Sequence, residues 1–184
     1  RRIRQEIEHL YELRDLILKL SSLDADAIVF EKTSFTAKGL LDDVELSIDY
    51  LIHQKNMSIE VLGDDFIFLA DRVWLLQALI NVVKNAVEVS PQEGEVSIIL
   101  HQNAIFKSII VRDSGPGLTQ EEQNRIFDRF YKSNPKSSGF GIGLALAHSI
   151  VKQQGGEILV HSSSQGSEFE LRFYSQVTKE KELV

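Results

Sequence analysis

Residues 72–90, RVWLLQALINVVKNAVEVS, form a long and largely apolar helix that constrains the fold more than any other stretch of the chain. Asp71 is expected to cap its start, because a carboxylate there accepts hydrogen bonds from the free amides of the first turn, and Pro91 marks its end. Within it, Asn81 and Asn85 are four residues apart and lie on one face. Two carboxamides in so apolar a helix are unfavourable unless paired. They either bond neighbouring backbone groups or offer an oxygen to Mg²⁺, a cation that prefers hard oxygen ligands.

The segments around this helix carry both helical and strand patterns. Further helices are predicted at 39–54, 119–127 and 143–154, and strands at 57–63, 65–70, 95–102, 105–114, 156–163 and 167–175. Neighbouring strands form hairpins with turns at Asn103 and at Gln165-Gly166. Thr119 and Glu122 have the spacing of a capping box. The sequence therefore predicts an α+β fold, a two-layer α/β sandwich with helices on one face of a mixed sheet, preceded by an N-terminal helix.

Residues 1–23 form an amphipathic helix whose apolar side chains recur at steps of three and four residues. They are Ile3, Ile7, Leu10, Leu13, Ile17 and Leu20. A lone helix of this kind must bury its apolar stripe on something. Either it folds back on the domain, or it is half of a helical hairpin or dimer bundle whose other half is absent from this chain. The second interpretation is favoured.

Composition excludes several classes of protein. The 184 residues are 43% hydrophobic and 26% charged, as in globular domains, and a chain that begins with Arg inside a helical pattern is expected to be part of a longer protein. No cysteine is present, so disulfides and cysteine zinc sites are excluded, and the five histidines show no metal-ligand pattern. The net charge of −7 argues against nucleic acid as a partner. A bound polyphosphate must therefore be held by local dipoles, a few cations and a metal.

Three short motifs follow the central helix. DSGPG, residues 113–117, places a carboxylate at the end of a strand, where it is either a turn residue or an acceptor for an exocyclic amine. RIFDRFYKS, residues 125–133, carries Arg129 and Lys132 among aromatic residues that are either core or neighbours of a phosphate. SGFGIGLALA, residues 138–147, is either a flexible hinge or a set of glycines that exposes the amides of a helix N-terminus, starting around residue 141, to an anion.

In this order and at these spacings, the motifs resemble a known family. NVVKNAVEVS, DSGPGL, IFDRFYKS and GFGIGLALA look like the N box, the first glycine box, the F box and the second glycine box of the GHKL ATPase and kinase superfamily. Within it, FDRFY points to the catalytic and ATP-binding domain of bacterial two-component sensor histidine kinases. The resemblance implies a Bergerat fold over residues 28–176, a tail at 177–184, and a partial dimerisation and phosphotransfer helix with its connector at 1–27.

The resemblance also implies roles for individual residues. Asn85 is the catalytic residue that coordinates Mg²⁺, with Asn81 in support, and Asp113 receives the amine of adenine. The other nucleotide contacts that it implies are Gly115, Gly117, Leu118, Phe130, Tyr131, Lys132, Gly139, Gly141, Ile142, Gly143, Leu144 and Ser167. Of these, Gly115 and Gly117 shape the floor under adenine, while the three alternate glycines bound a short lid and expose amides to phosphate.

The implied reaction transfers the γ-phosphoryl group of ATP, with Mg²⁺ as cofactor, to a histidine on a hairpin helix that this chain lacks. The implied partners are the protein's own dimerisation hairpin in a homodimer and a response regulator, and the implied location is the cytoplasmic side of a bacterial inner-membrane sensor. His9 is not followed by the acidic residue and the proline of the acceptor motif. It is therefore expected to be a surface residue of the helix.

Three departures from the family pattern keep other functions open. Glu88 and Val89 stand where the family commonly has a basic residue and then an aromatic residue or histidine, and Phe140 replaces a small residue. These departures motivate the alternative of a degenerate, non-catalytic GHKL module that acts as a signalling or dimerisation platform. A serine-directed kinase of the anti-sigma type is a third option, against which the N-terminal helix argues.

Overall fold

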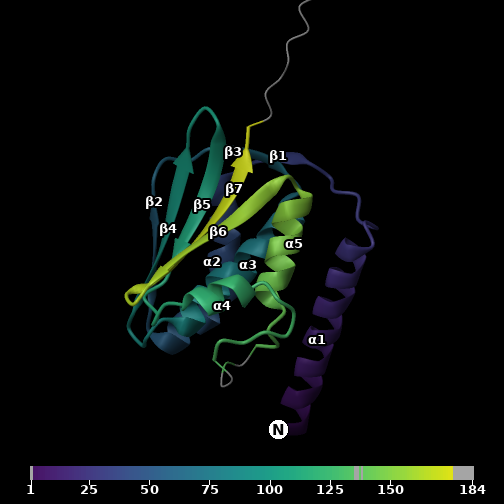
Figure 1. Ribbon diagram of the computed structural model, residues 1–184, viewed down its shortest axis with the longest axis vertical. Helices are drawn as coiled ribbons and strands as arrows, with labels where there is room; N and C mark the ends of the chain where they lie inside the picture. Colours follow the sequence, from purple (N-terminus) through teal and green to yellow (C-terminus); the bar gives the residue numbers. More distant parts are fainter. Residues whose placement is uncertain (1, 135–136, 138, 176–184) are drawn as a thin grey trace, which may run out of the picture.

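The computed structural model describes residues 2–134, 137 and 139–175, which form five helices and seven strands (Figure 1). In chain order they are α1 (Arg2–Asp24), β1 (Thr33–Thr36), α2 (Ala37–Lys55), β2 (Ser58–Leu62), β3 (Ile67–Ala70), α3 (Arg72–Val89), β4 (Glu95–Gln102), β5 (Phe106–Arg112), α4 (Gln120–Arg125), α5 (Gly143–Gln153), β6 (Gly156–Ser163) and β7 (Gly166–Tyr174). The predicted tail at 177–184 and the side chain of His9 lie outside what the structure describes.

Five strands form one mixed sheet in the order β2-β4-β5-β7-β6. β2 pairs with β4 in parallel, and the other neighbours are antiparallel. β1 and β3 form a separate two-stranded antiparallel sheet. Figure 1 shows α2, α3 and α5 on one side of the main sheet and α1 beside α5. The predicted two-layer sandwich of mixed sheet and helices is therefore confirmed.

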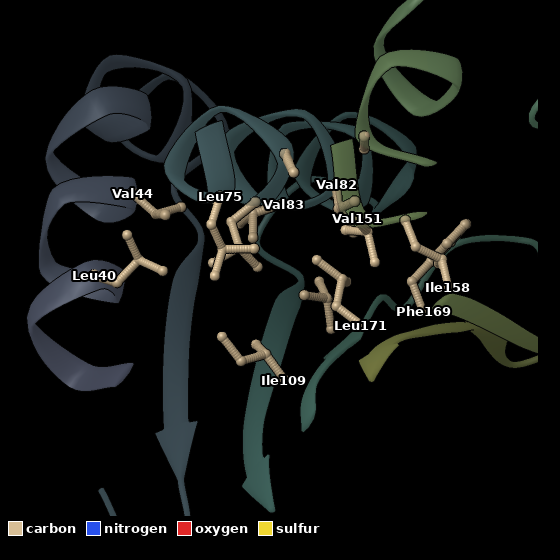
Figure 2. Packing of buried hydrophobic residues seen from close by; sticks show 14 of the residues in the cluster. Leu40, Val44, Leu75, Val82, Val83, Ile109, Val151, Ile158, Phe169 and Leu171 are labelled. Carbon is tan, nitrogen blue, oxygen red and sulfur yellow. The ribbon is translucent and has the colours of Figure 1, made fainter. Parts of the chain in front are cut away.

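The core lies between the sheet and the three helices that cover it (Figure 2). Alternate residues of β4, namely Val96, Ile98 and Leu100, are buried against the helices, as expected for strands with one covered face. From the other layer, α3 buries seven side chains, among them Leu75 and Leu79 with no exposed surface. Helix α3 is thus the central element of the helical layer.

Local capping explains where most helices begin. The Asp71 carboxylate accepts hydrogen bonds from Val73 N and Trp74 N at 3.1 Å each, which confirms it as the cap of α3. Thr119 and Glu122 form the predicted capping box of α4. Helix α5 begins at Gly143, as the helical pattern at 143–154 predicts, and not around residue 141. Gly141 adopts φ +71°, a left-handed conformation that cannot continue a right-handed helix.

The N-terminal helix packs on the domain with only part of the predicted stripe. Leu20 and Leu23 are buried, and Leu13 and Leu16 pack against the core beside them. Ile7, Leu10 and Ile17, which the sequence placed on the buried stripe, are exposed together with Tyr11 and Leu18. The second half of α1 therefore folds back on α5. No described element covers these apolar side chains. The hairpin interpretation stays a prediction.

Polar contacts with α5 and α3 help to hold the second half of α1 in place. Gln153 of α5 donates a hydrogen bond from Nε2 to the carbonyl oxygen of Leu23 at 2.6 Å. Lys19 donates from Nζ to Oε1 of Gln77 on α3 at 2.7 Å.

None of the helices in the described part of the chain has the length and apolar character that crossing a membrane requires.

Replacing Leu79 by alanine tests the central place of α3. Leu79→Ala leaves a cavity in the core and is expected to lower the free energy of unfolding by about 2–5 kcal/mol, measured by urea denaturation. Leu46 on α2 is 78% exposed and provides the matched control. Leu46→Ala is expected to change the free energy of unfolding by less than about 0.5 kcal/mol. Equal effects of the two substitutions would contradict the assignment of α3 to the core.

Candidate nucleotide site

One face of α3 connects the predicted binding motifs. Asn81, Asn85 and Val89 follow one another at steps of four residues and so share a face of the helix, over a rise of about 12 Å. At one end of this face, a Cβ atom built on Gly143 would lie 3.5 Å from Oδ1 of Asn81. At the other end, a Cβ atom built on Gly115 would lie 3.0 Å from Cγ2 of Val89. The structure therefore brings both glycine motifs to the same face of α3.

Asp113 is a buried carboxylate with a fixed orientation. Its Oδ1 accepts hydrogen bonds from Gly115 N at 2.8 Å and from Ser167 N at 3.1 Å. Burial raises the pKa of Asp113 above its ordinary value, while the two backbone hydrogen bonds act in the opposite direction. Within the described residues both bonds fall on Oδ1, which leaves Oδ2 available to accept a hydrogen bond from a ligand.

The loop after Asp113 is packed tightly against the β6–β7 hairpin. Gly117 has φ +76°, and a side chain there would overlap the carbonyl oxygen of Ser163. Leu118 N donates to Oγ of Ser162 at 2.7 Å, and that hydroxyl is 2.9 Å from Oγ of Ser167. The predicted group of Asp113, Gly117 and Ser167 is therefore assembled in one place.

The two asparagines on α3 lie partly buried, and one of them has a polar atom without a partner in the described part of the chain. Both are half-buried, and Nδ2 of Asn81 is buried without a hydrogen-bond partner among the described residues. A buried polar group without a partner is unfavourable, so such an atom indicates a ligand or ordered water. The described residues hold no group of three or more acidic, histidine or cysteine side chains that could bind a metal. Among the described residues, the ligands that this face of α3 offers to a hard cation are therefore amide oxygens and not a cluster of carboxylates.

One histidine does have a nearby carboxylate that the sequence pattern had not indicated. His53 Nε2 lies 3.2 Å from Oδ1 of Asp49, four residues earlier on α2. Both side chains are exposed, and no third ligand joins them among the described residues. This pair therefore does not form a metal site.

The N-terminus of α5 lacks the side-chain cap that the starts of α2, α3 and α4 possess. Thr36, Asp71 and Thr119 each accept a hydrogen bond from the first turn of their helices. Ile142, at the same position of α5, is buried and has no side chain able to do so. The first amides of α5, from Gly143 and Leu144 onward, are therefore left for an anion.

A backbone hydrogen bond joins the two ends of the segment between α4 and α5. Phe130 N donates to the carbonyl oxygen of Gly141 at 2.8 Å, and both residues have positive φ. Phe130 is exposed, Tyr131 is half-buried and Phe140 packs against the core. We call the hydrogen-bonded pair of Phe130 and Gly141 the lid neck. The predicted lid runs beyond it, and its residues 135, 136 and 138 lie outside the described part of the chain.

Inside the lid, Lys132 donates from Nζ to the carbonyl oxygen of Ser137 at 2.5 Å. Arg129, in contrast, pairs with Asp24 at the end of α1. The sequence had suggested that both cations could approach a phosphate. In this structure Arg129 instead links the lid neck to the N-terminal helix.

Several residues of the site carried no recognisable signal in the sequence. Ser162 reaches Ser167 because β6 and β7 pair these two residues directly. Gly166 lies so close to Asp113 that a side chain there would overlap the Asp113 carbonyl oxygen. Both positions depend on the register of the β6–β7 hairpin; its turn at Gln165-Gly166 was predicted, but not which of the neighbouring residues reach Asp113 and Ser167.

Comparisons with known proteins identify the family of this chain. Residues 70–176 match the family model described as histidine kinase-, DNA gyrase B-, and HSP90-like ATPase. That is more than half of the chain, so the chain belongs to this family. The predicted resemblance to the catalytic domain of sensor histidine kinases is confirmed.

Individual sequence relatives and solved structures align with more than nine-tenths of this chain. The sensor protein kinase PmrB of Pseudomonas aeruginosa is 29% identical over 179 residues, which are 96% of this chain and 38% of that protein. Full-length ShkA, solved in complex with AMPPNP, is 28% identical with a TM-score of 0.81, over 94% of this chain and 37% of ShkA. The histidine kinase ThkA, solved in complex with the response regulator TrrA, is 24% identical with a TM-score of 0.74, over 91% of this chain and 48% of ThkA. This chain therefore spans less than half the length of each of these relatives.

The glycines of the lid motif are expected to differ in their tolerance of a side chain. A Cβ atom on Gly141 would lie 2.6 Å from the carbonyl oxygen of Tyr131, on a backbone with φ +71°, whereas a Cβ atom on Gly139 would meet nothing within 4 Å. Gly141→Ala should therefore lower the free energy of unfolding by more than about 1 kcal/mol. Gly139→Ala, the matched control, should change it by less than about 0.5 kcal/mol. Urea denaturation measures both, and a larger cost for Gly139→Ala would show that the lid neck is wrongly placed.

Proposed function

We propose that this chain is the ATP-binding catalytic part of a two-component sensor histidine kinase. The observation that carries the proposal is the shared α3 face, which connects the fixed Asp113 carboxylate at one end with the uncapped amides of α5 at the other. The groups of a nucleotide follow the matching order, with an amine-bearing base at one end and anionic phosphates at the other. Family membership and the match to sensor kinases support this reading. None of the comparisons favours the non-catalytic alternative.

Each end of the site would bind a different part of the nucleotide. Asp113, held by Gly115 N and Ser167 N, accepts the hydrogen bond of the adenine amine through its remaining oxygen. Gly115 and Gly117 keep the adjoining backbone free of side chains, so that a flat ring can approach it. The first amides of α5 and the dipole of that helix bind phosphate oxygens.

Asn85 would hold Mg²⁺ through its side-chain oxygen, and Asn81 would support it. Bound Mg-ATP supplies the γ-phosphoryl group, which a histidine on a hairpin helix outside this chain accepts while ADP leaves. The chain's own contribution is to position the phosphates and to offset their charge, which accounts for most of the catalysis in phosphoryl transfer.

The remaining assignments concern the whole protein. Residues 1–27 would be part of the dimerisation and phosphotransfer hairpin with its connector, 28–176 the catalytic domain and 177–184 a tail. The exposed apolar residues of α1 suit a hairpin partner in a homodimer. A response regulator would receive the phosphoryl group, as the solved complex of ThkA with TrrA illustrates for that kinase. The catalytic part would face the cytoplasm in an inner-membrane sensor.

Calorimetric titration with Mg-ATP tests binding directly. The wild-type chain should bind, and both Asp113→Asn and Asn85→Ala should abolish binding, because one loses the acceptor for the adenine amine and the other the ligand to the metal. Asp64→Asn, at an exposed aspartate outside the site, is the control and should leave the affinity unchanged. Undiminished affinity in both site variants would refute the proposal.

In the full-length protein, radiolabel from ATP should appear as an acid-labile phosphohistidine and not as an acid-stable phosphoserine.

The raised pKa of Asp113 gives binding a characteristic dependence on pH. Only the carboxylate accepts the adenine amine, so ATP affinity should fall as pH is lowered from neutrality through the raised pKa of the free protein. The folded protein binds this proton more tightly than the unfolded chain, so ionisation of Asp113 costs stability as pH rises through the same range. Titrations at several pH values should show this fall in the wild type and in Asp64→Asn. Affinity that stays constant into the acid range would contradict the role given to Asp113.

A further inference from the structure

Lys55, which lies outside all of the binding motifs, caps the C-terminal end of α3. Nζ of Lys55, the last residue of α2, donates hydrogen bonds to the carbonyl oxygens of Val87 at 2.9 Å, Glu88 at 2.7 Å and Ser90 at 2.7 Å. An ammonium group has three donors, so these bonds use the full capacity of the side chain. They satisfy carbonyls that a helix end leaves without intrahelical partners. A cation is also favoured there by the dipole of α3.

The three acceptors surround Val89 in the chain. Two of them precede it and one follows it, so Lys55 holds the backbone on both sides of this residue. The backbone of Lys55 adds a further contact, because its carbonyl oxygen accepts a hydrogen bond from Glu93 N at 3.0 Å. The segment 87–93, which connects α3 to β4, is thus fastened to the end of α2.

This fastened segment supports the loop that carries Asp113. A Cβ atom on Gly115 would lie 3.0 Å from Cγ2 and 3.1 Å from the carbonyl oxygen of Val89, so the loop rests directly on that residue. Ser114 N also donates to Oγ of Ser90 at 3.2 Å. Asp113 directly precedes Ser114, and its carboxylate accepts a hydrogen bond from Gly115 N. A shift of residues 87–90 would therefore reach the Asp113 carboxylate through two direct contacts.

We infer that Lys55 is a positioning residue for the adenine end of the nucleotide site. It acts through the backbone at 87–90 and touches no nucleotide, because its ammonium is occupied by three carbonyls. The inference rests on the proposed ATP-binding function. It assigns Lys55 to recognition of the base and leaves the triphosphate end, at Asn81 and α5, independent of it.

Lys55→Met keeps the aliphatic stem and removes all three donors. The dissociation constant of Mg-ATP should rise about tenfold, and that of adenosine, which lacks phosphates, should rise by the same factor. Binding of Mg-tripolyphosphate, which lacks adenine, should not change. Lys55→Arg retains several donors and should recover most of the ATP affinity. In the full-length kinase the KM for ATP should rise while kcat at saturating ATP is retained.

Lys107→Met is the matched control, because Lys107 also donates from Nζ to a backbone carbonyl, that of Ile67 at 2.7 Å, and lies outside the site. It should leave ATP affinity unchanged. Equal ATP affinity in the wild type and in Lys55→Met, or an equal loss of ATP and tripolyphosphate binding, overturns the inference alone. Failure of the wild type to bind ATP overturns the proposed function and the inference with it. Should Lys55→Met fail to fold, Lys55→Gln, which is shorter, uncharged and keeps two donors, is titrated instead; it should raise the dissociation constants of Mg-ATP and adenosine by a smaller, equal factor and leave that of Mg-tripolyphosphate unchanged, and an unchanged affinity for Mg-ATP would overturn the inference.

Discussion

The burial of α3 against the sheet is the constraint on which the rest of the structure depends. Its apolar side chains fill the centre of the core, among them Leu75 and Val83 (Figure 2). The side chains of a helix project in fixed directions around its axis. Once its apolar faces are packed in the core, the direction of its polar edge is therefore fixed as well. That edge carries Asn81 and Asn85, and it can bind a ligand only because the remainder of the helix is held in place.

Both ends of α3 are fastened by charged side chains, that of the preceding residue Asp71 at the start and that of Lys55 on α2 at the end. At the start, Asp71 caps the first turn and also accepts a hydrogen bond from Glu31 N at 2.9 Å, which ties the connector after α1 to the helix. At the end, Lys55 binds the last carbonyls. The bonds are complementary in sign, an anion at the N-terminus and a cation at the C-terminus, as the helix dipole favours.

The N-terminal helix is connected to the lid by a short series of bonds. Asp24 pairs with Arg129, and the next residue, Phe130, is bonded to the carbonyl of Gly141. Gln153 holds the same end of α1 to α5, the helix whose first amides face the proposed phosphate site. The proposed hairpin helix and the lid segment thus share one set of contacts.

Local chemistry made much of this arrangement predictable from the sequence. Capping by Asp71 and Thr119, the turn at Asn103 and the alternating strands all depend on neighbours in the chain, and the structure confirms them. The motif residues could be named because their order and spacing are distinctive. What depends on packing between distant segments could not be foreseen. Which residues of the α1 stripe pack on α5 depends on the partner surface, so the periodicity alone did not distinguish buried Leu20 and Leu23 from exposed Ile7 and Leu10.

Contacts across the fold account for the other gaps. Nothing near Lys55 in the sequence reveals that it reaches the end of α3, and nothing near Arg129 reveals Asp24. Likewise, Ser162 enters the site only through the pairing of β6 with β7. Such contacts are set by the tertiary structure and not by local propensity.

Hydrogen exchange of the wild-type chain with and without a Mg-ATP analogue tests the central claim most directly. The account predicts slower exchange on binding at three separate places: residues 81–89 of α3, residues 113–118 after β5, and the first amides of α5 at 143–145. Protection of these three segments together would show that one nucleotide spans the α3 face from the Asp113 loop to the α5 N-terminus. Unchanged exchange in all three, or protection confined to another surface of the protein, would contradict it.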